Sequence, residues 1–471
     1  MTELYYLPAT ELARMIRTKQ CSPAEVMEAY LGRVEKVNPA LNAITHLDAD
    51  RARLLAREAQ REIEQGAPVG PLHGVPITIK SSIEVEGLRC ECGTKLRQGI
   101  VAERTAPLVT RLQQAGAIVI GSTNAPEFLM AYESDNFLYG RTNNPWNLDY
   151  TAGGSSGGEA AAIASGCSAG GMGSDGGGSV RVPAHFSGIC GLKPTPGLIP
   201  RTGHWPACLG PSAFLGLIGP MARTVEDVRL LLEISSGVDY HDPSAAPVVL
   251  ERPDEAEVLA TTVGWFEDYG NYPVTAETRQ AVRTAARALT GQGLPVEPME
   301  LQGMESARDL WWTMFGVVAA TLLKPLIEGR EGDLHPMTQG LMAAHEEESA
   351  TTYEQFLGAW VDRDRLRSKL LGQMQRHRVL VCPVSSIPAF RHGERSWNID
   401  GEIVKYPRPF VYSQIFNLLG NPAAVVPAGQ SPDGLPIAVQ IVGRPFEDEL
   451  VLSVAAKIEQ ALGGWKAPPE P

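Results

Sequence analysis

Two glycine-rich stretches carry serine side chains in positions that suit chemistry. The first, TAGGSSGGEAAAIASG at residues 151–166, places Ser155 and Ser156 between glycine pairs, and the second, GSDGGGSVRVPA at residues 173–184, places Ser179 after three glycines. Backbone N–H groups exposed by such turns can bind an anion at a helix N-terminus, or stabilise an oxyanion in acyl transfer. The first stretch is equally consistent with a serine helix cap and glycines that serve loop geometry alone.

Ser155 and Ser179 are separated by enough chain for one helix and a return turn, so both glycine loops can meet at one end of a sheet. A serine becomes a nucleophile only when a base accepts its proton, and neither motif contains a histidine. Lys80 ends the apolar alternation of GVPITIKSS, residues 74–82. Burial there would lower its pKa and give a neutral amine, so we take Lys80 as the candidate base.

Composition excludes several other classes of function. The net charge is -13, from 54 acidic and 41 basic residues, which argues against nucleic acid as a partner. The seven cysteines and nine histidines are scattered, and Cys90 and Cys92 have no second pair at zinc-site spacing, so we expect no metal and no cofactor. No G-K-[ST] follows either glycine cluster, which disfavours a phosphate cradle.

An odd number of cysteines without a disulfide framework favours a reducing compartment. The N-terminal segment MTELYYLPATELARMIR lacks the apolar run of a signal peptide. Together these features predict a cytoplasmic protein.

The elements that must position these residues follow a strand–helix rhythm. Ser22 to Glu25 is a capping box that predicts a helix start. The pattern predicts strands at 74–82, 117–121, 379–384 and 434–443, and helices at 51–65, 105–116, from 224, at 275–289, 353–377 and 447–462. We expect an α/β protein with a large twisted mixed sheet covered by helices on both faces. We expect residues 1–471 to form a single domain, with a helical region at 1–70 and a variable peripheral region at 237–375 that shapes the substrate pocket.

One mostly apolar run, Leu310–Leu323, is open to three interpretations. It is a buried helix, a wall of an apolar substrate pocket, or a lid that faces a membrane. The run is too short to span a bilayer, so no transmembrane segment is expected.

The chain resembles the amidase signature family of serine hydrolases. The resemblance rests on Lys80 in GVPITIKSS, on GGSSGGEAAAIASG, on GSDGGGSVRVPA, and on the later motifs GICGLKPTPG, GPMARTVEDV and NLLGNPAAVVP, so it spans almost the whole chain. A lone GGSSGG would be weak, whereas the ordered set of lysine strand, first serine and second serine is specific. The resemblance implies the amidase signature fold.

The resemblance also implies roles for individual residues. Ser179 would be the nucleophile, Ser155 a proton relay that follows a non-proline cis peptide, and Lys80 the base. The oxyanion hole would consist of the N–H groups of Gly176, Gly177, Gly178 and Ser179, and the supporting residues would be Ser156, Asp175 and Arg181. Gly176 stands where threonine or isoleucine is common in the family.

Two functions within this family are considered. Relatives that form the glutamine-hydrolysing component of a tRNA-dependent amidotransferase usually carry an acidic residue for the amino group of glutamine, but no Asp or Glu occurs from Ile403 through Pro432. The signature GGSSGGE is nearer to the fatty-acid-amide-hydrolase-like branch. The expected pocket residues are Leu129, Trp311, Trp312, Phe410 and Tyr412. These apolar and aromatic side chains predict a free-standing enzyme that hydrolyses apolar or aromatic amides, with carbamates (urethanes) and esters as further substrates. We expect the enzyme to be a monomer or homodimer.

Overall fold

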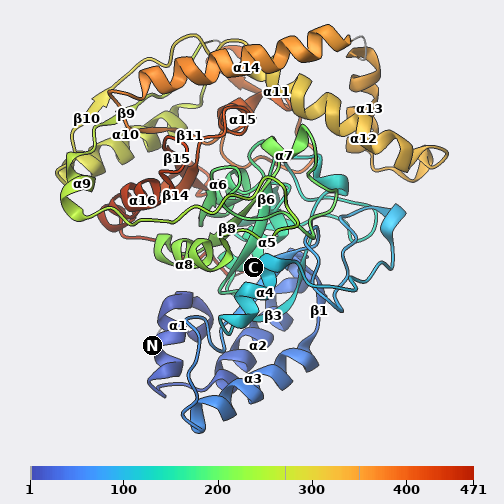
Figure 1. Cartoon of the computed structure of the whole chain (residues 1–471), viewed down its shortest axis with the longest axis vertical. Coiled ribbons are helices and arrows are strands. Elements are labelled where there is room, and N and C mark those ends of the chain that lie inside the picture. Colours follow the sequence, from blue (N-terminus) through green and yellow to red (C-terminus); the bar gives the residue numbers. More distant parts are fainter. Residues whose placement is uncertain (1–2, 271, 349–350, 471) are drawn as a thin grey trace.

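A large mixed sheet forms the centre of the molecule (Figure 1). The computed structural model describes residues 3–270, 272–348 and 351–470. Its main sheet has 11 strands in the order β1-β3-β2-β6-β8-β7-β14-β15-β11-β9-β10. The strands are β1 (Ile44–Leu47), β2 (Pro76–Lys80), β3 (Ile118–Thr123), β6 (Gly170–Asp175), β7 (Cys190–Lys193), β8 (Leu217–Ala222), β9 (Val263–Trp265), β10 (Val296–Pro298), β11 (Val379–Pro383), β14 (Ala423–Gln430) and β15 (Pro436–Val442). Two small hairpins pair β4 (Asn143–Asn144) with β5 (Asn147–Thr151) and β12 (Ser396–Ile399) with β13 (Glu402–Lys405).

The directions of neighbouring strands bring the two sequence motifs to the same edge. β2 runs parallel to both β3 and β6, whereas β6 and β8, and β14 and β15, are antiparallel pairs. Parallel strands end at the same edge of a sheet. Lys80 is the last residue of β2 and Asp175 the last of β6, so the candidate base and the second glycine motif leave the sheet together.

Helices cover both faces of the sheet. Ala424 and Val426 of β14 pack in one hydrophobic cluster with α8, α10 and α16, while Val425 packs in another with α5 and α6. Successive strand residues point to opposite faces, so the two clusters lie on opposite sides. These helices are α5 (Gly157–Ala164), α6 (Arg181–Ser187), α8 (Val225–Ser235), α10 (Ala276–Gly291) and α16 (Asp448–Leu462). The expected α/β class, with helices flanking a large mixed sheet, is confirmed.

The N-terminal helices form the blue end of the molecule in Figure 1. They are α1 (Ala9–Arg17), α2 (Pro23–Leu41) and α3 (Ala49–Glu64). The predicted capping box is present, because Ser22 Oγ accepts from the Glu25 N–H at 3.1 Å and the Glu25 carboxylate accepts from the Ser22 N–H at 2.8 Å. The expected strands correspond to β2, β3, β11 and β15, with ends displaced by a few residues. Other helices along the chain are α4 (Pro107–Gln114), α7 (Ser212–Leu215), α9 (Glu255–Ala260) and α15 (Val411–Leu418), with short 3-10 turns at Leu4–Tyr6, Lys95–Arg97, Glu127–Leu129, Glu331–Asp333 and Arg408–Phe410.

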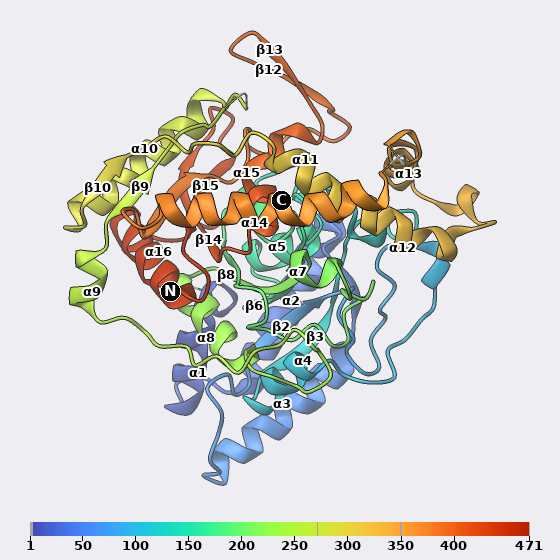
Figure 2. The ribbon, with the colours of Figure 1, turned by 45° about the horizontal axis from the view of Figure 1, so that its top comes forward.

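The region at 237–375 contributes both to the sheet and to its surroundings. Its short strands β9 and β10 extend the main sheet at one edge. Its last helices lie beside the sheet, with the long α14 crossing in front in Figure 2. They are α11 (Ala307–Trp311), α12 (Val318–Ile327), α13 (Pro336–Glu348) and α14 (Tyr353–Gln373).

A continuous helical segment, Ala307–Ile327, contains the apolar run singled out in the sequence; we call it the wall segment. It joins α11 to α12 through a π-helical stretch at Trp312–Val317. Its 21 residues make it longer than the apolar run suggested, and its most apolar 18-residue window has a mean hydropathy of 1.5. Among the described helices it alone has the length and composition to cross a membrane. Only 33% of its most apolar window is buried. Met314 and Leu323 are buried, whereas Leu322 and Leu326 are exposed, so the segment is not a fully buried core helix.

Candidate active site

Lys80 is completely buried at the end of β2 and contacts the first serine motif. Its Nζ donates to Ser155 Oγ at 2.6 Å and to Ser174 Oγ at 3.0 Å. Burial lowers the pKa of Lys80 to about 7, although the nearby carboxylates Asp175 and Glu159 act in the opposite direction. A substantial fraction of the amine is therefore neutral near neutral pH and can accept a proton.

Ser155 lies two residues before the start of α5, and the peptide bond that joins it to Gly154 is cis. The start of α5 approaches β6 closely because β6 is rich in glycine. A Cβ at Gly173 would lie 2.7 Å from Ser156 Oγ, and one at Gly171 would lie 2.1 Å from a carboxylate oxygen of Glu159. Side chains at these positions would therefore push the serine pair away from Lys80.

Ser179 belongs to the loop at residues 176–179, which follows β6 and which we call the glycine loop. Its carbonyl accepts from the Ser156 N–H at 3.1 Å, which ties the two motifs together. Ser155 and Ser179 line the same cavity, and Ser179 is 9% exposed. The fold thus gathers Lys80, Ser155 and Ser179 in one place, as the resemblance implies.

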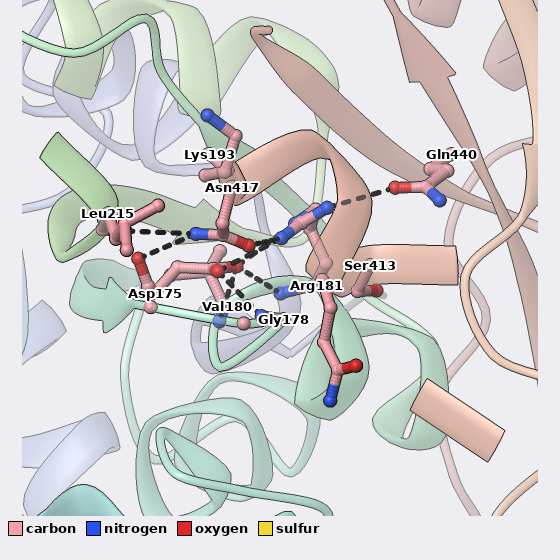
Figure 3. Close-up of polar contacts among 12 residues, drawn as sticks. Asp175, Gly178, Val180, Arg181, Lys193, Leu215, Ser413, Asn417 and Gln440 are labelled. Carbon is pink, nitrogen blue, oxygen red and sulfur yellow. Dashed lines mark hydrogen bonds and ion pairs between the residues drawn. The ribbon is translucent and has the colours of Figure 1, made fainter. Parts of the chain in front are cut away.

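A buried ion pair fixes the glycine loop from behind (Figure 3). Arg181 Nη2 and Nε each lie 3.0 Å from an oxygen of Asp175, and both side chains are inaccessible to solvent. Burial alone would raise the pKa of Asp175, but the Arg181 charge and its hydrogen bonds outweigh that effect and hold the carboxyl well below its usual range. Gln440 and Asn417 accept from the remaining guanidinium N–H groups. Asp175 and Arg181 therefore support the loop, as expected.

The same ion pair changes the expected oxyanion hole. The Gly178 N–H donates to Asp175 Oδ1 at 2.7 Å, so it is already engaged, and Gly178 does not line the cavity. Gly176, Gly177 and Ser179 do line the cavity. Within the described chain no group accepts from the N–H of any of these three. The N–H groups left to form the oxyanion hole are therefore those of Gly176, Gly177 and Ser179, without that of Gly178.

The cavity beside Ser179 is large and mostly apolar, with a volume of about 1340 Å³. The wall segment forms one side of the cavity and contributes Trp311 and Trp312 to its lining. Leu129 also lines the cavity, so three of the five expected pocket residues are found there. Sequence reasoning missed the other aromatic side chains of the lining, because nothing in their local pattern marks them. They are Phe128, Tyr132, Trp205, Phe315, Tyr353, Phe356 and Tyr406. The lining of the cavity is therefore mostly apolar and aromatic.

Phe410 and Tyr412, expected in the pocket, do not line it. Phe410 is buried and stacks on Tyr132 with ring centroids 3.9 Å apart. Tyr412 packs in a hydrophobic cluster, and its hydroxyl donates to the carbonyl of Tyr272 at 2.6 Å. Both rings therefore lie in the core and not in the cavity. Phe410 packs against Tyr132, whose ring does line the cavity.

Charged groups in the cavity are few. Of the lining residues that the structure describes, Asp175 is the sole carboxylate, and it is neutralised by Arg181. Arg308, Arg395 and Lys405 supply positive charge. Arg395 is paired with Glu133 at 2.5 Å. A ligand ammonium group would therefore meet no free carboxylate here.

Comparison with known proteins gives a consistent result. A model of the Amidase family matches residues 25–452. An acylamidase of Rhodococcus erythropolis is 35% identical over 480 residues, covering 99% of this chain and 98% of that protein. The A component of the glutamyl-tRNA(Gln) amidotransferase of Carboxydothermus hydrogenoformans is 32% identical over 495 residues, covering 99% of this chain and 100% of that protein. Among solved structures, a bacterial aryl acylamidase of the amidase signature family superposes with a TM-score of 0.87 at 28% identity, covering 98% of this chain and 97% of that one.

Proposed function

The chain belongs to the amidase family and is an amide hydrolase, and we propose that its substrates carry an apolar or aromatic group and react through an acyl-enzyme on Ser179. The proposal rests on the hydrogen bond that joins Lys80 to Ser155, beside a cavity lined by Ser179 and aromatic rings.

The first half of the reaction forms the acyl-enzyme. Neutral Lys80 accepts the proton of Ser155 Oγ, which accepts the proton of Ser179 Oγ as that oxygen attacks the substrate carbonyl carbon. The carbonyl oxygen becomes an oxyanion, stabilised by the N–H groups of Gly176, Gly177 and Ser179, for which the described residues offer no other acceptor. The C–N bond then breaks while Ser155 donates its proton to the nitrogen and regains one from protonated Lys80, because an amide nitrogen leaves poorly unless it is protonated. Lys80 is then neutral again.

The second half releases the acid. A water molecule loses a proton along the same path, from Ser155 to Lys80, and attacks the acyl carbon. The ester bond to Ser179 breaks and the proton held by Lys80 returns through Ser155 to Ser179 Oγ. The acid formed loses its own proton to solvent and leaves as a carboxylate. Aryl carbamates and esters present the same carbonyl to the same groups, so we include them among the substrates.

The cavity favours this substrate class over glutamine. Each Å² of apolar surface that a ligand buries contributes roughly 25 cal/mol, so an aromatic ring adds a few kcal/mol of binding. Glutamine offers little apolar surface and brings an ammonium group, for which the described lining has no free carboxylate. The two sequence identities are close and do not separate an acylamidase from an amidotransferase component, so the lining of the cavity carries the argument.

Steady-state kinetics of the isolated chain test the proposal. We expect kcat/KM for an aryl amide or aryl carbamate to exceed that for glutamine by at least about a hundredfold, which corresponds to roughly 2.7 kcal/mol. Ser179→Ala provides the background rate for every substrate. Glutamine turnover equal to that of the aryl substrates would refute the proposal and support the amidotransferase function.

A further inference from the structure

Three consecutive carbonyl groups, from the last residue of β6 into the glycine loop, each accept a hydrogen bond from a side chain that comes from a distant part of the sequence. Asp175 O accepts from Asn417 Nδ2 at 3.0 Å, Gly176 O from Trp311 Nε1 at 2.9 Å, and Gly177 O from the Tyr132 hydroxyl at 2.9 Å. This close approach requires glycine at position 177, where a Cβ would lie 2.5 Å from the Trp311 ring and 2.9 Å from the Tyr132 oxygen.

Holding a carbonyl also sets the direction of the next N–H. The peptide unit is planar, and in its trans form the N–H points opposite to the preceding C=O. The unit between Gly177 and Gly178 is held at both ends, by Tyr132 at its carbonyl and by Asp175 at its N–H. The unit between Gly176 and Gly177 is held at its carbonyl by Trp311 alone. Its N–H has no acceptor among the described residues.

We propose that Trp311 is a positioning residue, whose indole N–H holds the Gly177 N–H in the direction that stabilises the oxyanion. The inference rests on the proposed amide hydrolysis at Ser179. Trp311 lies in the wall segment and stacks on Phe315 with ring centroids 5.2 Å apart, and both rings line the cavity. One side chain therefore bounds the substrate and orients a donor for the transition state.

The neighbouring tryptophan supplies a matched comparison. Trp312 also lines the cavity, but its buried indole Nε1 has no hydrogen-bond partner among the residues that the structure describes. Replacing either tryptophan by phenylalanine puts a smaller ring in the cavity lining, but only Trp311→Phe removes an N–H that holds the glycine loop.

The experiment compares Trp311→Phe with Trp312→Phe. The readouts are kcat and KM for an aryl amide, and the inhibition constant of an aryl trifluoromethyl ketone, whose adduct with Ser179 carries an oxyanion. For Trp311→Phe we expect kcat to fall about 10- to 100-fold and the inhibition constant to rise by a similar factor, with KM changed less than about threefold; outright loss of one oxyanion donor costs about 100- to 1000-fold. For Trp312→Phe we expect KM and the inhibition constant to change in parallel.

A second set of variants keeps the test decisive. Benzothienylalanine at position 311 preserves the shape of tryptophan without its N–H, and gives the same expected losses should Trp311→Phe fail to fold. Tyr132→Phe should cost less, because Asp175 still holds that peptide unit. Retention of kcat and inhibitor affinity within about twofold in both variants at 311, or losses confined to KM, would overturn the role of Trp311. Full activity of Ser179→Ala would instead overturn the proposed function on which it rests.

Discussion

The rate of hydrolysis should rise about tenfold between pH 6 and pH 8, because Lys80 must be neutral to accept a proton. With the pKa of Lys80 lowered to about 7 by burial, the neutral fraction is about one tenth at pH 6, one half at pH 7 and nine tenths at pH 8. An exposed lysine would be neutral in fewer than about one molecule in a thousand at pH 7. Burial therefore raises the concentration of active base by more than about two orders of magnitude at neutral pH.

The assay is kcat/KM for an aryl amide across the neutral range. We expect one inflection near pH 7 and a plateau on the alkaline side. Lys80→Met should lower the rate by several orders of magnitude and remove the inflection. Lys80→Arg should fare no better, since a guanidinium stays protonated and cannot accept a proton.

A second buried group titrates in the same range and must be separated from Lys80. Burial raises the pKa of Glu159 to about 7, although Thr78 and Thr123 donate hydrogen bonds to its carboxyl. Glu159→Gln should keep the inflection and displace it slightly toward acid, because the charge of Glu159 raises the pKa of Lys80. An inflection that survives in Lys80→Met, or a wild-type rate that is highest in acid, would refute the role of Lys80.

Two further variants test the glycine loop. Ser179→Ala should abolish labelling by a fluorophosphonate and lower kcat by several orders of magnitude, whereas Ser156→Ala should still be labelled; labelled Ser179→Ala would contradict the assignment of the nucleophile. Asp175→Asn leaves the charge of Arg181 buried and unpaired, so the free energy of unfolding in urea should fall by about 3–5 kcal/mol. A loss below about 1 kcal/mol would show that other groups support the loop.

The site was predictable from sequence where local pattern and residue type suffice. Lys80, Ser155 and Ser179 lie in motifs that specify a strand end and two glycine loops. The hydrogen bond from Trp311 to Gly176 joins residues 135 positions apart, so no local sequence pattern predicts it. The engagement of the Gly178 N–H depends on how the Asp175 side chain turns back on its own loop.

Other differences reflect the limits of periodicity. Phe410 and Tyr412 lie near a family motif, but the direction of their side chains depends on packing against Tyr132 and Tyr272. The strands β9 and β10 have three residues each, too few for an alternation to be recognised, so the region at 237–375 gave no signal for its part in the sheet.

The position of the wall segment has a consequence for how substrate range could diversify. The segment contributes no strand to the sheet, so insertions or exchanges along Ala307–Ile327 can reshape the cavity without disturbing the strands that carry Lys80 and Asp175. In the role proposed for Trp311, its indole nitrogen is the one atom of the wall segment that catalysis constrains. Grafting a wall from a relative with different preferences should then transfer specificity at full turnover only when the graft brings a hydrogen-bond donor to the carbonyl of Gly176.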